Sequence, residues 1–110
     1  MELSLDVRTE RGAAVLEVSG EVDIYTAPKL REKLVELVES GNERIVVDLE
    51  GVGFMDSTGL GSLVAGLKRV KERDGEMVLV CTRDPVLKVL GITGLDRVFS
   101  VHGSVSEALG

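Results

Sequence analysis

The chain has few of the residues that build disulfides, metal centres or base-stacking surfaces. Its 110 residues include one cysteine, one histidine, one tyrosine, two phenylalanines and no tryptophan. A single cysteine excludes an intrachain disulfide and a multi-cysteine metal site, and carboxylates at metal-ligand spacing are also lacking. The aromatic residues are too few for a platform that stacks single-stranded nucleic acid. We therefore expect no metal ion and no cofactor.

Positive charge is also in deficit. The chain carries 13 Lys and Arg against 19 Asp and Glu, which gives a net charge of −6. A nucleic-acid-binding domain needs a basic face to neutralise phosphates, but acidic residues interrupt the densest basic stretch, residues 68–73. We interpret that stretch as a solvated helix face. The acidic balance argues against nucleic acid and favours a basic protein partner.

Long hydrophobic runs are missing too. No stretch approaches the roughly 18 apolar residues of a membrane span, and the N-terminus lacks the pattern of a signal peptide. The simplest expectation is a cytoplasmic protein without membrane association. A content of 44% hydrophobic and 29% charged residues is typical of a globular domain. Cys81 lies in the apolar run 77–81, so we expect a buried, inert thiol.

Alternating apolar residues predict an N-terminal hairpin of two strands, near residues 3–7 and 14–18. A loop over residues 20–25 is predicted next. Thr26 is the expected N-cap of a first helix, with Pro28 in its first turn. One apolar stripe then marks the buried face of this helix: Leu30, Leu34, Leu37 and Val38.

The middle of the chain predicts a second strand–helix unit. The apolar run 45–49 is typical of a central strand covered on both faces. A connecting loop is predicted over residues 51–56. A second helix is predicted from about Ser57 to before Gly75, followed by a strand at 77–81.

In the C-terminal part of the chain, helix-boundary residues indicate where the elements begin and end. Asp84 is the expected N-cap of a short helix, and Gly91 is its expected stop. A strand is predicted over 98–101. Ser104 and Glu107 have the spacing of a capping box, which predicts a final short helix.

The predicted order is β-β-α-β-α-β-α-β-α, which places the chain in the α/β class with a small, mostly parallel, mixed sheet. Binding sites in such sheets form at the carboxyl ends of strands, here residues 20–25 and 51–57. Five residues are expected at the sheet–helix interface: Val46, Val47, Leu63, Leu67 and Leu79.

The segment Met55-Asp56-Ser57-Thr58-Gly59-Leu60-Gly61 places two hydroxyls at the start of a helix. The first backbone N–H groups of a helix lack internal partners, so a phosphate on Ser57 would meet ready donors. Two glycines would let another surface approach the first turn. Plain N-capping by Ser57 or Thr58 accounts for the same residues. The nucleophile elbow of a serine hydrolase and the phosphate loop of a nucleotide-binding protein are both missing.

Residues 55–61 resemble the signature of anti-sigma factor antagonists, the bacterial branch of the STAS domain family. Residues 20–31 are similar to the start of that family's first helix, and Ile92-Thr93-Gly94-Leu95 resembles its later motif. The resemblance covers essentially the whole chain. It implies a single STAS domain over residues 1–110, with a small mixed sheet and helices packed mainly on one side.

The resemblance also implies a mechanism. In this family the serine that follows the motif's aspartate, here Ser57, is phosphorylated by the cognate anti-sigma factor, a GHKL-type serine kinase that also sequesters a sigma factor. The unphosphorylated antagonist binds this kinase and frees the sigma factor, phosphorylation abolishes binding, and a PP2C-type phosphatase restores it. The chain is thus expected to be a monomeric kinase substrate and not an enzyme. The expected partner-binding residues are Asp23, Tyr25, Asp56, Ser57, Thr58, Gly59 and Gly61.

Some roles stay open at this point. Asp23 would either satisfy the backbone of its own loop, contact the partner or orient Ser57. Asp56 would either stabilise its turn or contact the phosphorylation site. Thr58 is a competing phosphorylation site, with N-capping as its favoured role. The alternative functions are a STAS scaffold or interaction module of another signalling system, and a small nucleotide-binding protein, for which the sequence offers no phosphate loop or lysine clamp.

Overall fold

The strands lie in the sheet in the order in which they occur along the chain. The computed structural model describes residues 2–110. Strands β1 and β2 form an antiparallel hairpin, and every later pair is parallel, which confirms the predicted mixed sheet. The strand bounds are β1 Leu3–Glu10, β2 Ala13–Val22, β3 Arg44–Met55, β4 Glu76–Val80 and β5 Val101–His102.

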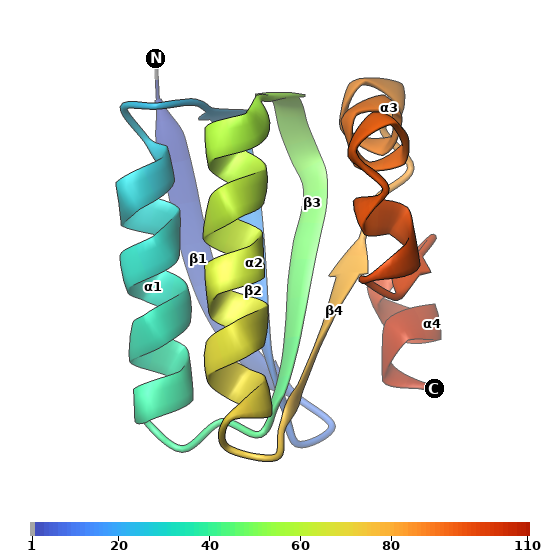
Figure 1. The fold of residues 1–110 in the computed structure, drawn as a ribbon. Coiled ribbons are helices and arrows are strands. Elements are labelled where there is room, and N and C mark those ends of the chain that lie inside the picture. The colour runs from blue at the N-terminus through green and yellow to red at the C-terminus, as the bar shows by residue number, and fades with distance from the viewer. Residues whose placement is uncertain (1) are drawn as a thin grey trace.

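Two parallel helices cover one face of this sheet. Helices α1 (Ala27–Glu39) and α2 (Ser57–Lys71) lie side by side across β1, β2 and β3, and α3 (Asp84–Thr93) lies beside the carboxyl end of β3 (Figure 1). The short α4 (Val105–Leu109) contacts β3, β4 and β5. The predicted order of elements is therefore confirmed, with one additional 3-10 helix at Leu95–Arg97.

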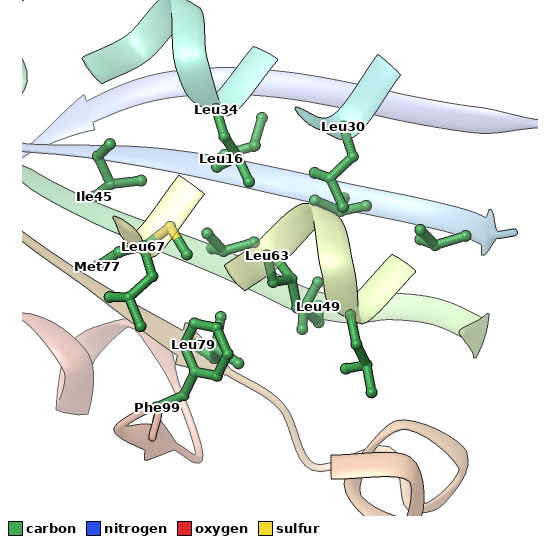
Figure 2. Packing of buried hydrophobic residues seen from close by; sticks show 14 of the residues in the cluster. Leu16, Leu30, Leu34, Ile45, Leu49, Leu63, Leu67, Met77, Leu79 and Phe99 are labelled. Atoms are coloured by element: carbon green, nitrogen blue, oxygen red, sulfur yellow. The ribbon is translucent and has the colours of Figure 1, made fainter. Parts of the chain in front are cut away.

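The core between the helix pair and the sheet is built from aliphatic side chains. The predicted stripe of α1 is buried, and α2 buries Leu60, Leu63, Leu67 and Val70 on its corresponding face. Figure 2 shows leucines from both helices over the side chains of β2, β3 and β4. Leu63 is fully buried at the centre of this layer.

A smaller apolar cluster lies on the opposite face of the sheet. Val46 belongs to it, so its predicted burial at a sheet–helix interface is confirmed, but the helix on this side is the short α4 and not α1 or α2. Side chains on a strand alternate between faces, and Val46 follows Ile45, which points to the helices. The other members are Ala13, Val15, Val80 and Leu109.

The two central strands are longer than predicted. Strand β2 continues through Val22 and β3 through Met55, so residues 20–22 and 51–55, which were predicted to lie in loops, belong to strands. Val52 and Met55 are buried, and the pairing continues past register shifts near Ser19 and Gly20. A side chain at position 51 would overlap the Ser19 hydroxyl, which explains why a glycine lies inside this strand.

Element boundaries in the C-terminal part also differ from the predictions. Asp84 lies inside α3 and not at its N-cap, and the helix continues past Gly91 to end at Gly94, whose φ of 76° is left-handed. The last strand is Val101–His102, not 98–101. Ser104 does cap α4, because its hydroxyl accepts from Glu107 N at 3.1 Å.

Candidate functional site

The two segments that the sequence singled out, residues 20–25 and 51–57, lie next to each other at the carboxyl ends of β2 and β3. Strands β2 and β3 are parallel neighbours, and Val22 at the end of β2 pairs with Met55 at the end of β3. The backbone N–H of Asp56 donates to the Val22 carbonyl at 3.2 Å. The start of α2 and the β2–α1 loop therefore form one continuous surface, at the upper end of the sheet in Figure 1.

Asp56 is the residue that caps α2. Its Oδ1 accepts hydrogen bonds from the backbone N–H of Thr58 at 2.9 Å and of Gly59 at 3.1 Å. The prediction that Ser57 or Thr58 provides the cap is therefore wrong. The extended backbone of Asp56, with ψ of −174°, allows its carboxylate to reach the first turn. Of the two roles considered for Asp56, the structure shows the turn-stabilising one.

This arrangement leaves the two hydroxyls on the first turn of α2 exposed. Ser57 and Thr58 both face solvent, and within residues 2–110 no hydrogen bond holds the Ser57 hydroxyl. The hydroxyl of Ser62, one turn further along, is buried and donates to the Ala27 carbonyl at 2.9 Å. Ser62 thereby ties α2 to the start of α1, a structural role that the sequence did not reveal.

Asp23 organises the neighbouring loop. It is 6% exposed, and its Oδ1 accepts from the backbone N–H groups of Tyr25 at 2.9 Å and Thr26 at 3.0 Å. The structure thus shows the backbone-satisfying role considered for Asp23, and within residues 2–110 it makes no hydrogen bond to Ser57. Thr26 occupies the N-cap position of α1, but its hydroxyl donates to the Glu21 carbonyl at 2.8 Å and does not cap the helix.

The hydrogen bonds around Asp23 have a consequence for stability. Burial alone raises the pKa of Asp23, but the bonds from Thr26 and Tyr25 outweigh it and hold the pKa below its ordinary value of 3.8. The folded state therefore binds a proton less readily than the unfolded chain. It follows that this carboxylate stabilises the fold above pH 3.8 and loses that contribution as pH falls through its folded pKa.

We expect Asp23→Asn to be less stable than the wild type at pH 7 because the amide loses the charge that these N–H groups stabilise. The difference in unfolding free energy should shrink as pH falls below 3.8, where the wild-type carboxylate takes up its proton. Urea unfolding of both proteins between pH 3 and 7 measures it, with exposed Asp6→Asn as the control. A difference that is constant over this range would contradict the assignment.

The two glycines of the motif have different roles. A Cβ at Gly59 would lie 2.7 Å from Val22 Cγ1 and 2.8 Å from Met55 Cγ, so Gly59 lets α2 pack against the ends of β2 and β3. Gly59 is buried, and the expectation that its missing side chain admits another protein is wrong. At Gly61 a Cβ would meet nothing within 4 Å. Of the two glycines, only Gly61 leaves open space above the first turns of α2.

Several large apolar side chains are exposed in the β2–α1 loop, near the end of β3 and on α3. Tyr25, which the sequence singled out, is 85% exposed, and Ile24 beside it is 63% exposed. Phe54, near the end of β3, is 45% exposed, and Ile92 on α3 is 77% exposed. Sequence reasoning missed Ile24 and Phe54 as surface residues. Exposed large apolar residues such as Ile24 and Tyr25, which are adjacent in one loop, are typical of protein-binding surfaces when they form a patch.

Other kinds of site find little support in the described part of the chain. Across residues 2–110, no helix has the length and apolar content needed to cross a membrane. The same residues contain no cluster of three His, Cys, Asp or Glu side chains suited to a metal ion. Cys81 is buried as predicted, and burial raises the pKa of its thiol, which makes the reactive thiolate less accessible.

Comparison with known proteins agrees with this geometry. The sequence matches the STAS domain family over residues 4–108. It is 37% identical to an anti-sigma-B factor antagonist of Bacillus subtilis over 101 residues, 92% of each chain. It is also 36% identical to one of Staphylococcus aureus over 102 residues, 93% of this chain and 94% of the relative.

A solved structure extends the likeness to three dimensions. The crystal structure of an anti-sigma factor antagonist from Mycobacterium paratuberculosis superimposes with a TM-score of 0.91 at 29% identity, covering 98% of this chain and 92% of the other. The sequence match and the structural match thus both extend over nearly the full length of the chain. The chain belongs to the STAS domain family.

Proposed function

We propose that this chain is an anti-sigma factor antagonist that acts in the cytoplasm as one STAS domain spanning residues 1–110. In its unphosphorylated form it binds an anti-sigma factor of the GHKL kinase type, and the sigma factor held by that kinase is released. Phosphorylation of Ser57 ends the binding, and a PP2C-type phosphatase restores it. The single observation that carries the proposal is the exposed Ser57 hydroxyl, unbonded within residues 2–110, on a helix start that Asp56 already caps.

The unphosphorylated surface suits a protein partner. Ser57 presents a small neutral hydroxyl, Gly61 adds no side chain, and Tyr25 offers a large amphipathic one. Aromatic residues are enriched among the residues that carry most of an interface's binding energy. Asp23, whose Oδ1 holds the Tyr25 backbone, positions this anchor in the proposal and does not itself reach the partner.

A phosphate at Ser57 changes this surface without unfolding it. It adds about −1.5 to −2 charges at pH 7, next to the Asp56 carboxylate. An interface closed around a neutral hydroxyl would then enclose a bulky anion that lacks a donor, which opposes binding. Asp56 already occupies the N–H groups of Thr58 and Gly59, so they are not the ready donors that the sequence suggested. The partial positive charge of the helix N-terminus still favours a nearby anion, so the fold itself should tolerate the phosphate. In this proposal phosphorylation therefore switches binding off by changing the charge and size of the surface, while the fold stays the same.

In this proposal the chain supplies the acceptor hydroxyl and the kinase supplies the catalytic machinery. Asp56 caps α2 through its Oδ1 and need not act as a base toward Ser57, because the kinase supplies the active site. The chain is accordingly a regulatory binding protein and a kinase substrate, not an enzyme.

The test is to incubate the protein with its cognate kinase and Mg-ATP and to map the product by mass spectrometry. We expect one added phosphate, located on Ser57, none in Ser57→Ala, and none when the chain is incubated with Mg-ATP alone. Thr58→Ala is the matched control, because Thr58 is equally exposed on the same turn and should be dispensable for phosphorylation. Phosphate on Thr58 with Ser57 unmodified would refute the assignment.

A further inference from the structure

The starts of α1 and α2 are joined through one buried hydroxyl. Ser62 is 5% exposed, and its Oγ donates to the carbonyl of Ala27, the first residue of α1, at 2.9 Å. A longer hydrogen bond of 3.3 Å reaches the Thr58 carbonyl, one turn earlier in α2. Within residues 2–110, no other side-chain hydrogen bond joins the first turns of these two helices.

Packing contributes little on the outer side of this junction. A hollow of about 330 Å³ lies there, and its walls include Pro28, Gly61 and Ser62 itself. A Cβ at Gly61 would meet no atom within 4 Å. At the far ends of the same helices, Glu39 of α1 pairs instead with two arginines of the α2 segment. The Ser62 hydroxyl is therefore the polar contact that fixes the spacing of the two helix starts.

Each end of this contact leads to a residue of the proposed kinase-binding surface. The backbone N–H of Ala27 donates to the Asp23 carbonyl at 2.8 Å, and Asp23 Oδ1 accepts from the Tyr25 N–H at 2.9 Å. On the other side, Thr58 directly follows Ser57 in the first turn of α2. A shift of one helix start against the other would therefore move Tyr25 relative to Ser57.

We propose that Ser62 is a positioning residue for partner recognition, whose hydroxyl keeps Tyr25 and Ser57 at the spacing that the anti-sigma factor kinase recognises. This inference rests on the proposed function and adds to it a residue that does not touch the partner, because Ser62 is buried. A surface that already has its binding geometry loses less conformational freedom on association. Ser62 thus contributes to affinity through the position of Tyr25.

The experiment is a double-mutant cycle on the affinity for the kinase of the phosphorylation test above, measured by calorimetry with ADP present. We expect Ser62→Ala to weaken binding about fivefold or more in the wild type. When Tyr25 is already alanine, the same change should weaken it by less than about twofold, because coupled residues do not act additively. Ser62→Thr keeps the hydroxyl, and the adjoining hollow has room for its methyl group, so it should bind within about twofold of the wild type.

The matched control is Glu39→Gln, which removes the ion pairs at the far ends of the same two helices and should leave the kinase affinity within about twofold. In the free ¹⁵N-labelled protein, Ser62→Ala should shift the backbone signal of Tyr25, and Glu39→Gln should not. Melting curves show that each variant is folded. If Ser62→Ala is unfolded, Ser62→Cys, which has a similar size but donates weakly, replaces it in the cycle.

Wild-type affinity in Ser62→Ala would overturn the inference. An equal loss of affinity in both Tyr25 backgrounds would also overturn it, because Ser62 would then not act through Tyr25. So would an equal loss in Glu39→Gln, which would mean a general loosening of the helix pair. These outcomes leave the proposed function standing. A wild type that the kinase does not bind would overturn the proposed function, and this inference with it.

Discussion

Ser57→Asp is expected to weaken binding to the cognate anti-sigma factor by about thirtyfold or more. The reason is that a carboxylate would enter an interface built around a neutral hydroxyl, next to Asp56 and without a compensating donor. An unpaired charge in an interface costs about 2–5 kcal/mol, and each 1.4 kcal/mol is a factor of ten in affinity. Calorimetric titration of the kinase in the presence of ADP measures the difference.

The fold of this variant should remain intact. Negative charge in the first turn of a helix is favourable by about 0.3–1 kcal/mol, so the melting temperature should stay level or rise slightly. Ser57→Ala is the matched control. It removes only a small hydroxyl, which makes no hydrogen bond within residues 2–110. This variant should still bind the kinase but cannot be phosphorylated. Wild-type affinity in a normally melting Ser57→Asp protein would contradict the electrostatic part of the mechanism.

Leu63→Ala is expected to lower the free energy of unfolding by about 2–5 kcal/mol. Leu63 is fully buried in α2, in the layer between the helix pair and the sheet (Figure 2). Its truncation removes apolar contacts and leaves a cavity that the neighbouring leucines fill only in part. Since small domains are stable by only about 5–15 kcal/mol, the variant should unfold at a clearly lower urea concentration.

The control for this prediction is Lys68→Ala, on the exposed face of the same helix, which should change stability by less than about 0.5 kcal/mol. A loss below about 0.5 kcal/mol in Leu63→Ala would mean that the helix face is wrongly assigned. Both unfolding curves should have the same slope against urea, because the surface exposed on unfolding is nearly unchanged.

The sequence predicted the elements best where a long apolar pattern repeats. The stripes of α1 and α2 recur over about two to three turns, and the structure confirms both helices and their buried faces. The ends of β2 and β3 were harder to predict because Gly20 in β2 and Gly51 and Gly53 in β3 interrupt the apolar pattern. Parallel pairing over a register shift extends both strands, and such pairing depends on a neighbour distant in sequence.

The residue that caps α2 was predicted less well than the position of the motif at residues 55–61. Asp, Ser and Thr are all good N-cap residues. Because the three occur in succession here, residue type alone does not show which of them caps the helix. The backbone angles of Asp56 decide the matter, and they follow from its hydrogen bond to the end of β2. The role of Gly59 depends likewise on Val22, a residue of β2 that is distant in sequence. The sequence thus placed the motif at the start of α2, but the role of each residue within it depends on tertiary contacts.

The measurement that tests the central claim most directly is the affinity of the kinase for the enzymatically phosphorylated protein. Aspartate carries about half the charge of a phosphate, so the modified protein itself decides the question. We expect phosphorylated wild type to bind at least thirtyfold more weakly than the unmodified protein while melting at a similar temperature, with phosphatase treatment restoring the affinity. Equal affinity of the two forms would contradict the account.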